Sequence, residues 1–213
     1  MILYVILLLI IAFIAYIFGS LDTRVVASNL IFGRGLRRLG KGGAWFSNFY
    51  RLYGVKGFIK IGLVEIVKNL LPIIIGGLLL SIKGHPVHGR AFAGFCLVMG
   101  TLFSAFYNLR GSHGAIALAI AAVCVESSVG IAAAAVMAAV AWFSKYVSLG
   151  VIVGAFAVIL ASVLVIDDKL LILLNVFTAL LVLVKHVPAM ARLIKGTESK
   201  FKIEEDISYK FDE

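Results

Sequence analysis

Residues 1–18 read MILYVILLLIIAFIAYIF, an uninterrupted apolar run that decides the fold class. A helix needs about 20 apolar residues to cross the hydrocarbon core of a bilayer, and this run has that length. A cleavable signal peptide is the alternative, but no basic region precedes the run and no A-x-A site stands before Gly19. We therefore expect the run to be kept as a membrane-spanning helix.

The composition of the whole chain agrees with a membrane protein. Of its 213 residues, 62% are hydrophobic and 15% are charged, whereas soluble domains have about 45–50% apolar and about 25% charged residues. A soluble enzyme, a disordered tail and a disulfide-rich secreted module are therefore excluded. Cys96 and Cys124 lie inside apolar runs and the four histidines are scattered. The sequence thus predicts no disulfide framework, no metal site and no cofactor.

Further apolar runs follow the first. The stretch 114–143 is long enough for one steep helix or two short ones, and Glu126-Ser127-Ser128, with Gly130 after it, favours a tight hairpin. The sequence predicts an all-α integral membrane protein with about seven transmembrane helices, six being the alternative. Residues 1–196 would form a single polytopic membrane domain and residues 197–213 a charged cytoplasmic tail. The expected spans are 1–18, 57–82, 91–107, 114–126, 128–143, 148–165 and 170–186.

The basic residues set the expected orientation. With the N-terminus outside, the cytoplasmic segments are 19–56, 108–113, 144–147 and 187–213, and they carry most of the lysines and arginines. The external loops then carry only Lys83, Arg90 and Lys169. This asymmetry follows the positive-inside rule, so we expect the C-terminus to be cytoplasmic. Topology also accounts for most of the net charge of +9, and no nucleic-acid partner is expected.

The second expected span contains ionisable residues. Lys60, Glu65, Lys68 and Pro72 fall on one face of a helix at about 100° per residue. Charged groups inside a membrane are costly, so they indicate a functional site facing the bundle interior. The alternative is that Glu65 and Lys68, three residues apart, form a pair and that Lys60 reaches to the interface.

Glycines and basic residues cluster in the expected cytoplasmic segments. The stretch 33–57 combines many glycines with arginines and lysines. Backbone N–H groups at glycines can converge on an anion, and arginine can bind a phosphate with two hydrogen bonds. A lipid-headgroup contact is the alternative interpretation. Similar clusters stand at 110–114, at 145–148 and at His186 with Arg192, and together they predict one site for an anionic, phosphorylated substrate.

The order of these motifs resembles the bacterial acyl-phosphate:glycerol-3-phosphate acyltransferase family of the PlsY type. Residues 36–54, LRRLGKGGAWFSNFYRLYG, are similar without a gap to the family's first motif, LRxxGSGNxGxxNxxRxxG. Gly19-Ser20 resembles the family's end of the first helix, and Glu65 to Pro72 resembles its D-x-x-K-G-x-x-P pattern. Lys145 to Ser148 and residues 186–198 are similar to its last two motifs.

Several positions depart from the family pattern. Lys41, Gly43 and Trp45 replace Ser, Asn and Gly of the first motif. In the middle motif, Thr101 stands for His, Ser104 for Pro and His113 for the phosphate-loop Lys. Residues 22–24 replace Pro-Phe-Gly, and Ala189 replaces the closing Asn.

The resemblance implies transfer of a fatty acyl group from acyl phosphate to glycerol 3-phosphate, giving lysophosphatidate for phospholipid biosynthesis. It places the protein in a bacterial plasma membrane, among membrane lipids, with the site on the cytoplasmic face. Because of the replaced residues, a non-catalytic paralogue that binds lipid, phosphate or a protein is the alternative, and a small transporter is a further one. No catalytic residue is assigned. The expected phosphate-binding residues are Ser20, Arg37, Gly40, Gly42, Ser47, Asn48, Arg51, Lys68, Arg110, Gly111, Gly114, Lys145, Ser148, His186 and Arg192.

Overall fold

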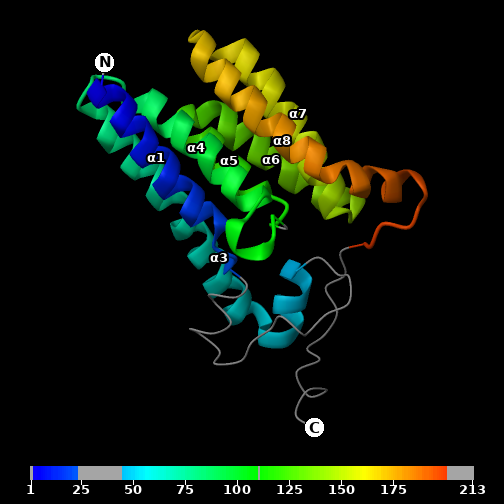
Figure 1. The fold of residues 1–213 in the computed structure, drawn as a ribbon. Coiled ribbons are helices and arrows are strands. Elements are labelled where there is room, and N and C mark those ends of the chain that lie inside the picture. The colour runs from blue at the N-terminus through cyan, green and yellow to red at the C-terminus, as the bar shows by residue number, and fades with distance from the viewer. Residues whose placement is uncertain (1, 24–44, 110, 201–213) are drawn as a thin grey trace.

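The computed structural model describes residues 2–23, 45–109 and 111–200, with the side chains of 45–53, 58 and 107 left aside. Within these ranges the chain forms α-helices and one short 3-10 turn, and they pack into a helical bundle (Figure 1). The all-α prediction is confirmed for this part of the chain. The elements are α1 (Ile2–Ser20), α3 (Trp45–Ser81), α4 (Pro86–Leu102), η2 (Ala105–Tyr107), α5 (Ala115–Val125), α6 (Ser127–Ser144), α7 (Val147–Val165) and α8 (Lys169–Ile194).

The helix α4 occupies the centre of the bundle and contacts α1, α3, α5 and α8. The backbones of α1 and α4 approach closely because glycines face the contact. A Cβ built on Gly100 would lie 2.2 Å from the carbonyl oxygen of Tyr16, and one built on Gly19 would lie 2.1 Å from that of Leu97. Since backbone atoms cannot move aside as a side chain can, the packing requires glycine at both positions.

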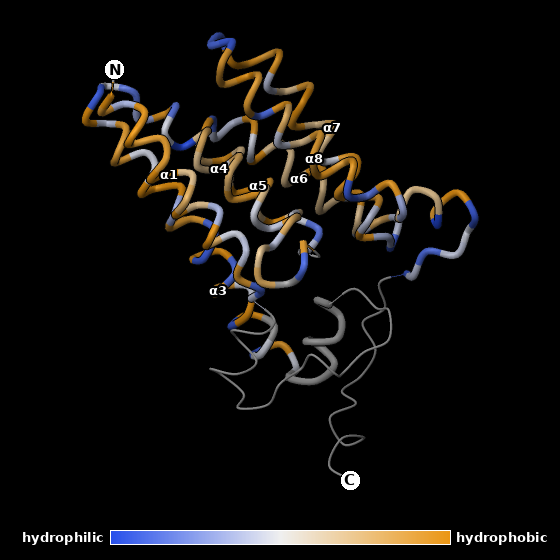
Figure 2. The backbone as a smooth tube through the Cα atoms, in the orientation of Figure 1, coloured by the Kyte–Doolittle hydropathy of each residue, from blue (hydrophilic) through white to orange (hydrophobic). Residues whose placement is uncertain are grey.

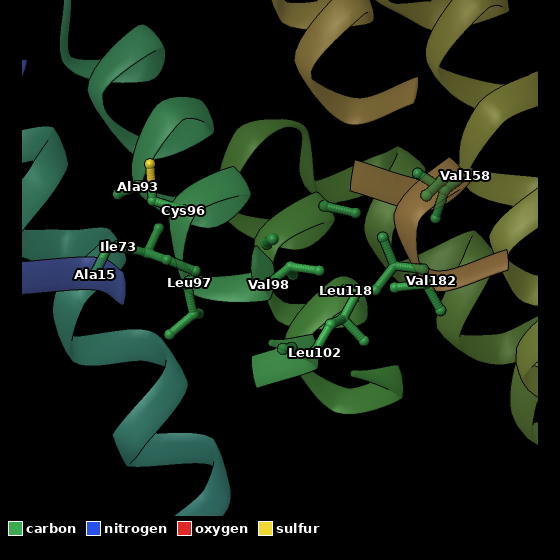
Figure 3. Packing of buried hydrophobic residues seen from close by; sticks show 14 of the residues in the cluster. Ala15, Ile73, Ala93, Cys96, Leu97, Val98, Leu102, Leu118, Val158 and Val182 are labelled. Atoms are coloured by element: carbon green, nitrogen blue, oxygen red, sulfur yellow. The ribbon is translucent and has the colours of Figure 1, made fainter. Parts of the chain in front are cut away.

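A continuous apolar core joins the two sides of the bundle. Leu97 and Leu102 of α4 are fully buried, as are Val158 of α7 and Val182 of α8. Figure 3 shows these side chains running from Ile73 of α3, through α4 and α5, to α7 and α8. The core therefore fixes α4 and α8 relative to each other. Helix α8 carries His186 and Arg192 of the candidate site, and the end of α4 lies against Ser20.

The outer surface of the bundle is apolar. Hydrophobic residues cover the helices along their length (Figure 2), and large side chains such as Phe13, Leu78 and Leu164 are exposed. Five of the described helices are long and apolar enough to cross a membrane: α1, Gly54–Ser81 within α3, α6, α7 and α8, while α5 is a shorter apolar helix. Apolar side chains on such a surface face lipid instead of water.

The predicted hairpin within 114–143 is confirmed. Helix α5 ends at Val125 and α6 begins at Ser127, with Glu126 between them in an extended conformation. The Glu126 side chain accepts a hydrogen bond from the backbone N–H of Ser128 and so caps α6. An acidic cap also suits the positive end of the helix dipole.

Four helix boundaries, in three helices, differ from the expected spans. Residues 45–53, expected in a loop, belong to α3, which bends at Gly54 (φ 62°, ψ −167°) before it continues to Ser81. Helix α4 begins at Pro86, because proline at the first helical position needs no N–H partner, and it ends at Leu102, not at 107. Helix α8 continues past Pro188 to Ile194, eight residues beyond the expected end.

Candidate functional site

The end of α1 is joined to the end of α4 by hydrogen bonds. The Ser20 hydroxyl donates to the Gly100 carbonyl at 3.4 Å, and the Ser104 hydroxyl donates to the Ser20 carbonyl at 2.6 Å. The Tyr16 hydroxyl donates to the Phe103 carbonyl at 2.7 Å. By the resemblance Ser104 replaces a proline, and its hydroxyl supplies a contact that proline cannot make. This departure therefore reinforces the α1–α4 junction.

Lys68 lies in a buried polar cluster of α3. Its Nζ donates to Glu65 Oε1 at 3.3 Å and to the Leu21 carbonyl at 3.2 Å. Asn69 Nδ2 donates to the same Glu65 oxygen at 3.1 Å, and both Glu65 and Asn69 are buried. The structure therefore contains the Glu65–Lys68 pair. Lys60 is exposed, which agrees with the alternative interpretation that this lysine reaches to the membrane interface. Lys68 also ties α3 to the residue that follows α1.

The segment between α4 and α5 folds back on the end of α4. The Gly111 N–H donates to the Leu102 carbonyl at 3.2 Å, and the Ser112 N–H donates to the Thr101 carbonyl at 2.8 Å. These two amides of the expected phosphate-binding turn are thus already bonded to backbone carbonyls. The Thr101 hydroxyl donates to Leu97 at 2.9 Å within its own helix. Gly114, with φ 72°, then provides the N-cap of α5.

The end of α8 reverses the chain through Gly196. Gly196 has φ 68°, its N–H donates to the Leu193 carbonyl at 3.1 Å, and the Thr197 N–H donates to the Arg192 carbonyl at 2.9 Å. This pair of bonds is the Schellman motif, in which glycine readily adopts the left-handed conformation at the end of a helix. The reversal returns Glu198 to the side of α8.

Glu198 connects α7 to α8. Its Oε1 accepts a hydrogen bond from the Ser148 hydroxyl, and its Oε2 accepts one from Arg192 Nε at 2.6 Å. Partial burial raises the pKa of Glu198. The hydrogen bonds from Ser148 and Arg192 and the charges of Arg192 and His113 have a larger, opposite effect. The pKa of Glu198 is therefore below its ordinary value. The expected site residues Ser148 and Arg192 are therefore brought together by a carboxylate.

His186 lies inside α8 and is 2% exposed. Its Nδ1 donates to the Val182 carbonyl at 2.8 Å, and this bond fixes the orientation of the ring within α8. The sequence also allowed His186 to be a cap at the C-terminus of the last helix, but α8 continues for eight residues beyond it, so this interpretation was wrong. The His113 ring lies 5.4 Å from the His186 ring, measured between centroids. The 111–114 turn is therefore next to α8.

Lys145 occupies the turn between α6 and α7. It has a left-handed backbone conformation, with φ 62°, and its Nζ lies 4.7 Å from the centroid of the Trp142 ring. This cation–π contact is on an exposed surface. Lys145 therefore makes an exposed contact with an aromatic ring, whereas Lys68 makes partly buried hydrogen bonds to Glu65 and Leu21.

Some expected site residues lie outside the described residues: Arg37, Gly40, Gly42 and Arg110, and likewise Lys41 and Gly43. Ser47, Asn48 and Arg51 lie in the first part of α3, where only the helix is described. In the described ranges no group of three His, Cys, Asp or Glu side chains is arranged to hold a metal ion.

The described candidates form two groups joined by the segment after α4. Ser20 lies at the end of α1 and Lys68 in the interior of α3, whereas Ser148, His186 and Arg192 lie on α7 and α8. Residues 100–104 contact the first group, and His113 contacts the second. The sequence analysis placed Glu198 within the last motif, at 186–198, but did not count it among the site residues, although its carboxylate joins Ser148 to Arg192. Glu198 could have been found from its position two residues after Gly196. A glycine directly after a helix often reverses the chain, and the reversal returns the following carboxylate to the side of the helix.

Comparison with known proteins gives a consistent result. A sequence model of the family described as glycerol-3-phosphate acyltransferase matches residues 9–196. Glycerol-3-phosphate acyltransferase of Trichlorobacter lovleyi is 32% identical over 88% of this chain and 94% of its own length. Glycerol-3-phosphate acyltransferase 2 of Bacillus anthracis is 27% identical over 88% of this chain and 95% of its own.

The fold is also similar to solved structures. Crystal structures of PlsY (YgiH), an integral membrane glycerol 3-phosphate acyltransferase, match with TM-scores of 0.76 for the glycerol 3-phosphate form and 0.75 for the lysophosphatidic acid form. Each covers 92% of this chain and 96% of its own, at 22% and 20% identity. The described helices therefore have the arrangement of an integral membrane protein.

Proposed function

The chain belongs to the glycerol-3-phosphate acyltransferase family, and from this we infer that it transfers a fatty acyl group from acyl phosphate to the 1-hydroxyl of glycerol 3-phosphate. The hydroxyl oxygen bonds to the acyl carbon, and the bond from that carbon to the phosphate oxygen breaks. The hydroxyl proton leaves with inorganic phosphate, and the product is lysophosphatidate. Acyl phosphate is already activated, so the protein needs to position and shield two anions.

The proposed site lies at the end of the bundle where α1, α4 and α8 end. Ser20, the 111–114 turn, Ser148, His186 and Arg192 belong to it, and Arg37, Gly40, Gly42, Ser47, Asn48, Arg51 and Arg110 complete it by resemblance. Lys68 has three N–H donors, of which two are bonded to Glu65 and Leu21. The third remains for a phosphate oxygen. Lys145 would contribute charge at the edge.

We place this end of the bundle in the cytoplasm of a bacterium, with the protein in the plasma membrane. Seven crossings and an external N-terminus fit the helix order, because α1, α4, α6 and α8 would then all end on the cytoplasmic side. That side carries Lys56, Lys145, Arg192, Lys195 and Lys200, whereas the other end carries Lys83, Arg90 and Lys169.

The proposal rests on hydrogen bonds between motifs that lie far apart in the sequence. Hydrogen bonds join Ser20 to residues 100 and 104, and Ser148 to residue 198. A protein that used these motifs only for topology would not need such contacts.

The test is turnover by purified protein in lipid. Acyl phosphate and glycerol 3-phosphate are added, and phosphate release is measured. We expect release that needs both substrates and that falls at least tenfold in Lys68→Ala, with no loss in Lys60→Ala, an exposed lysine of the same helix. Gel filtration and thermal unfolding check that both variants are folded.

Absence of turnover, under conditions in which the Trichlorobacter lovleyi relative is active, would overturn the proposal. Glycerol 3-phosphate binding without turnover would identify a non-catalytic member of the family.

A further inference from the structure

Lys185 on α8 makes contacts that a simple topology signal does not require. Its Nζ donates to the Leu102 carbonyl at 2.9 Å, and the ammonium lies 5.2 Å from the centroid of the Phe103 ring. A lysine near the end of a membrane helix ordinarily extends its ammonium into water or the headgroups. Lys185 is instead half-buried and turned toward the end of α4.

The Leu102 carbonyl is a favourable acceptor for a cation. It belongs to the last turn of α4, where carbonyl oxygens have no partner within the helix and the helix dipole is negative. The same oxygen accepts the Gly111 N–H at 3.2 Å. One atom therefore joins α4, α8 and the segment that leads into α5.

Lys185 and His186 hold opposite ends of this segment. Lys185 contacts it at Leu102 and Phe103, where α4 ends. His186, the next residue of α8, lies against His113, just before α5 begins. Between these points, the segment is fixed to α4 by the Gly111 and Ser112 amides.

We propose that Lys185 is a positioning residue that fixes the 103–114 segment for binding of the phosphate substrate. It acts through the Leu102 carbonyl and does not itself touch substrate. The expected effect of Lys185 on substrate binding rests on the proposed function. The expected effect of Lys185 on the order of the segment rests only on the contacts described above. A charge-assisted hydrogen bond at a partly buried site is strong enough for this role.

The experiment compares three variants of the full-length protein in lipid nanodiscs. Lys185→Met removes the donor and keeps the side-chain length, and Lys185→Arg restores a charged donor. Lys195→Met is the matched control, because Lys195 is an exposed lysine at the end of the same helix. Backbone amide hydrogen exchange is followed by mass spectrometry in peptides from 103–114, with peptides from α1 and α7 as references.

We expect exchange in 103–114 to be about tenfold faster in Lys185→Met, the factor for a lost hydrogen bond to a charged group. Exchange in α1 and α7 should stay unchanged, Lys195→Met should match the wild type, and Lys185→Arg should restore most of the protection. Equal exchange of 103–114 in Lys185→Met and the wild type would overturn the proposal. Faster exchange throughout the chain would also overturn it, because Lys185 would then support the whole fold.

Kinetics provide the second readout. Lys185→Met should raise KM for glycerol 3-phosphate several-fold with a smaller change in kcat, and Lys185→Arg should reverse the increase. An unchanged KM in an active enzyme would contradict the positioning role. A wild type without turnover contradicts the proposed function alone, because hydrogen exchange still decides whether Lys185 orders the segment.

Discussion

His88 Nε2 lies 3.0 Å from Asp168 Oδ2, and this pair joins the beginning of α4 to the beginning of α8. The other end of α4 is joined to α8 by the hydrogen bond from Lys185 to the Leu102 carbonyl. Asp168 also caps α8, since its Oδ1 accepts the N–H groups of Leu170 and Leu171. The central helix of the bundle is thus fixed to α8 at both ends.

Replacing Asp168 with asparagine should lower the melting temperature at neutral pH. The hydrogen bond from the Leu171 N–H, with those from Leu170 and His88 and the charge of His88, holds the pKa of Asp168 below its ordinary value, against a smaller opposing effect of burial. A lowered pKa stabilises the folded state above the unfolded value of about 3.9, and this stabilisation disappears as the pH falls through the folded value. Thermal unfolding measured from pH 7 to pH 3 should therefore show the variant approaching the wild type at the acid end.

Asp167→Asn serves as the control for that series, because it changes the neighbouring exposed carboxylate. A loss of stability in Asp168→Asn that stays constant down to pH 3 would contradict the electrostatic explanation.

Glu198→Gln should weaken the connection between the beginning of α7 and the end of α8. It removes the charge that binds Arg192 and weakens the bond from Ser148, so we expect a loss of about 1 kcal/mol, discounted because Arg192 is half exposed. Because the folded pKa of Glu198 is lowered, this contribution is present above about pH 4.3 and is lost below it. Melting temperatures of both proteins at pH 7 and pH 3.5 give the measurement; the difference should be larger at pH 7.

Gly100→Ala should disrupt the junction of α1 and α4. The new Cβ would overlap the Tyr16 carbonyl, at an expected cost of about 1–3 kcal/mol or more, and thermal unfolding in detergent measures it. Gly62→Ala in α3 is the matched control, since nothing lies within 4 Å of its Cβ. It should be neutral or stabilising by up to about 1 kcal/mol through helix propensity. Equal stability of the two variants would show that the close approach of α1 and α4 is not maintained.

Lys68→Met should destabilise the protein more than the double variant Lys68→Met/Glu65→Gln. The single change leaves the buried Glu65 carboxylate without its cation, and breaking a buried pair costs about 3–5 kcal/mol. The double change removes both charges, and glutamine can still accept the bond from Asn69. A double-mutant cycle on melting temperature measures the coupling. If the two single losses simply add, Glu65 and Lys68 do not interact.

The sequence predicted the helices well where apolar runs end at strong polar signals. The α5–α6 hairpin followed from Glu126 and two serines, and α7 from the run 148–165. It failed at the ends of α3 and α8, because glycines, Pro188 and the charges of Lys185 and Arg192 are typical of loops. In α8, Lys185 contacts the end of α4, and His186 lies against His113 in the segment before α5. Such tertiary contacts override local preference and have no signal in a single sequence.

The site was predictable as a set of residue types but not as a set of contacts. The pairing of Glu65 with Lys68 followed from their spacing of three. The bond from Ser104 to Ser20 joins residues 84 positions apart, and no periodicity relates them. Glu198 was missed because it stands in a segment of mixed charge that is typical of a solvated tail.

The left-handed glycine at the end of α8 has a practical consequence for shortened versions of the protein. The family match ends at residue 196, so a truncation designed from that boundary would keep every described helix. It would also remove Glu198, whose carboxylate connects Ser148 to Arg192, and Lys200, which lies over the Tyr146 ring. A minimal version for expression should therefore extend at least to residue 200, with any affinity tag attached after that point.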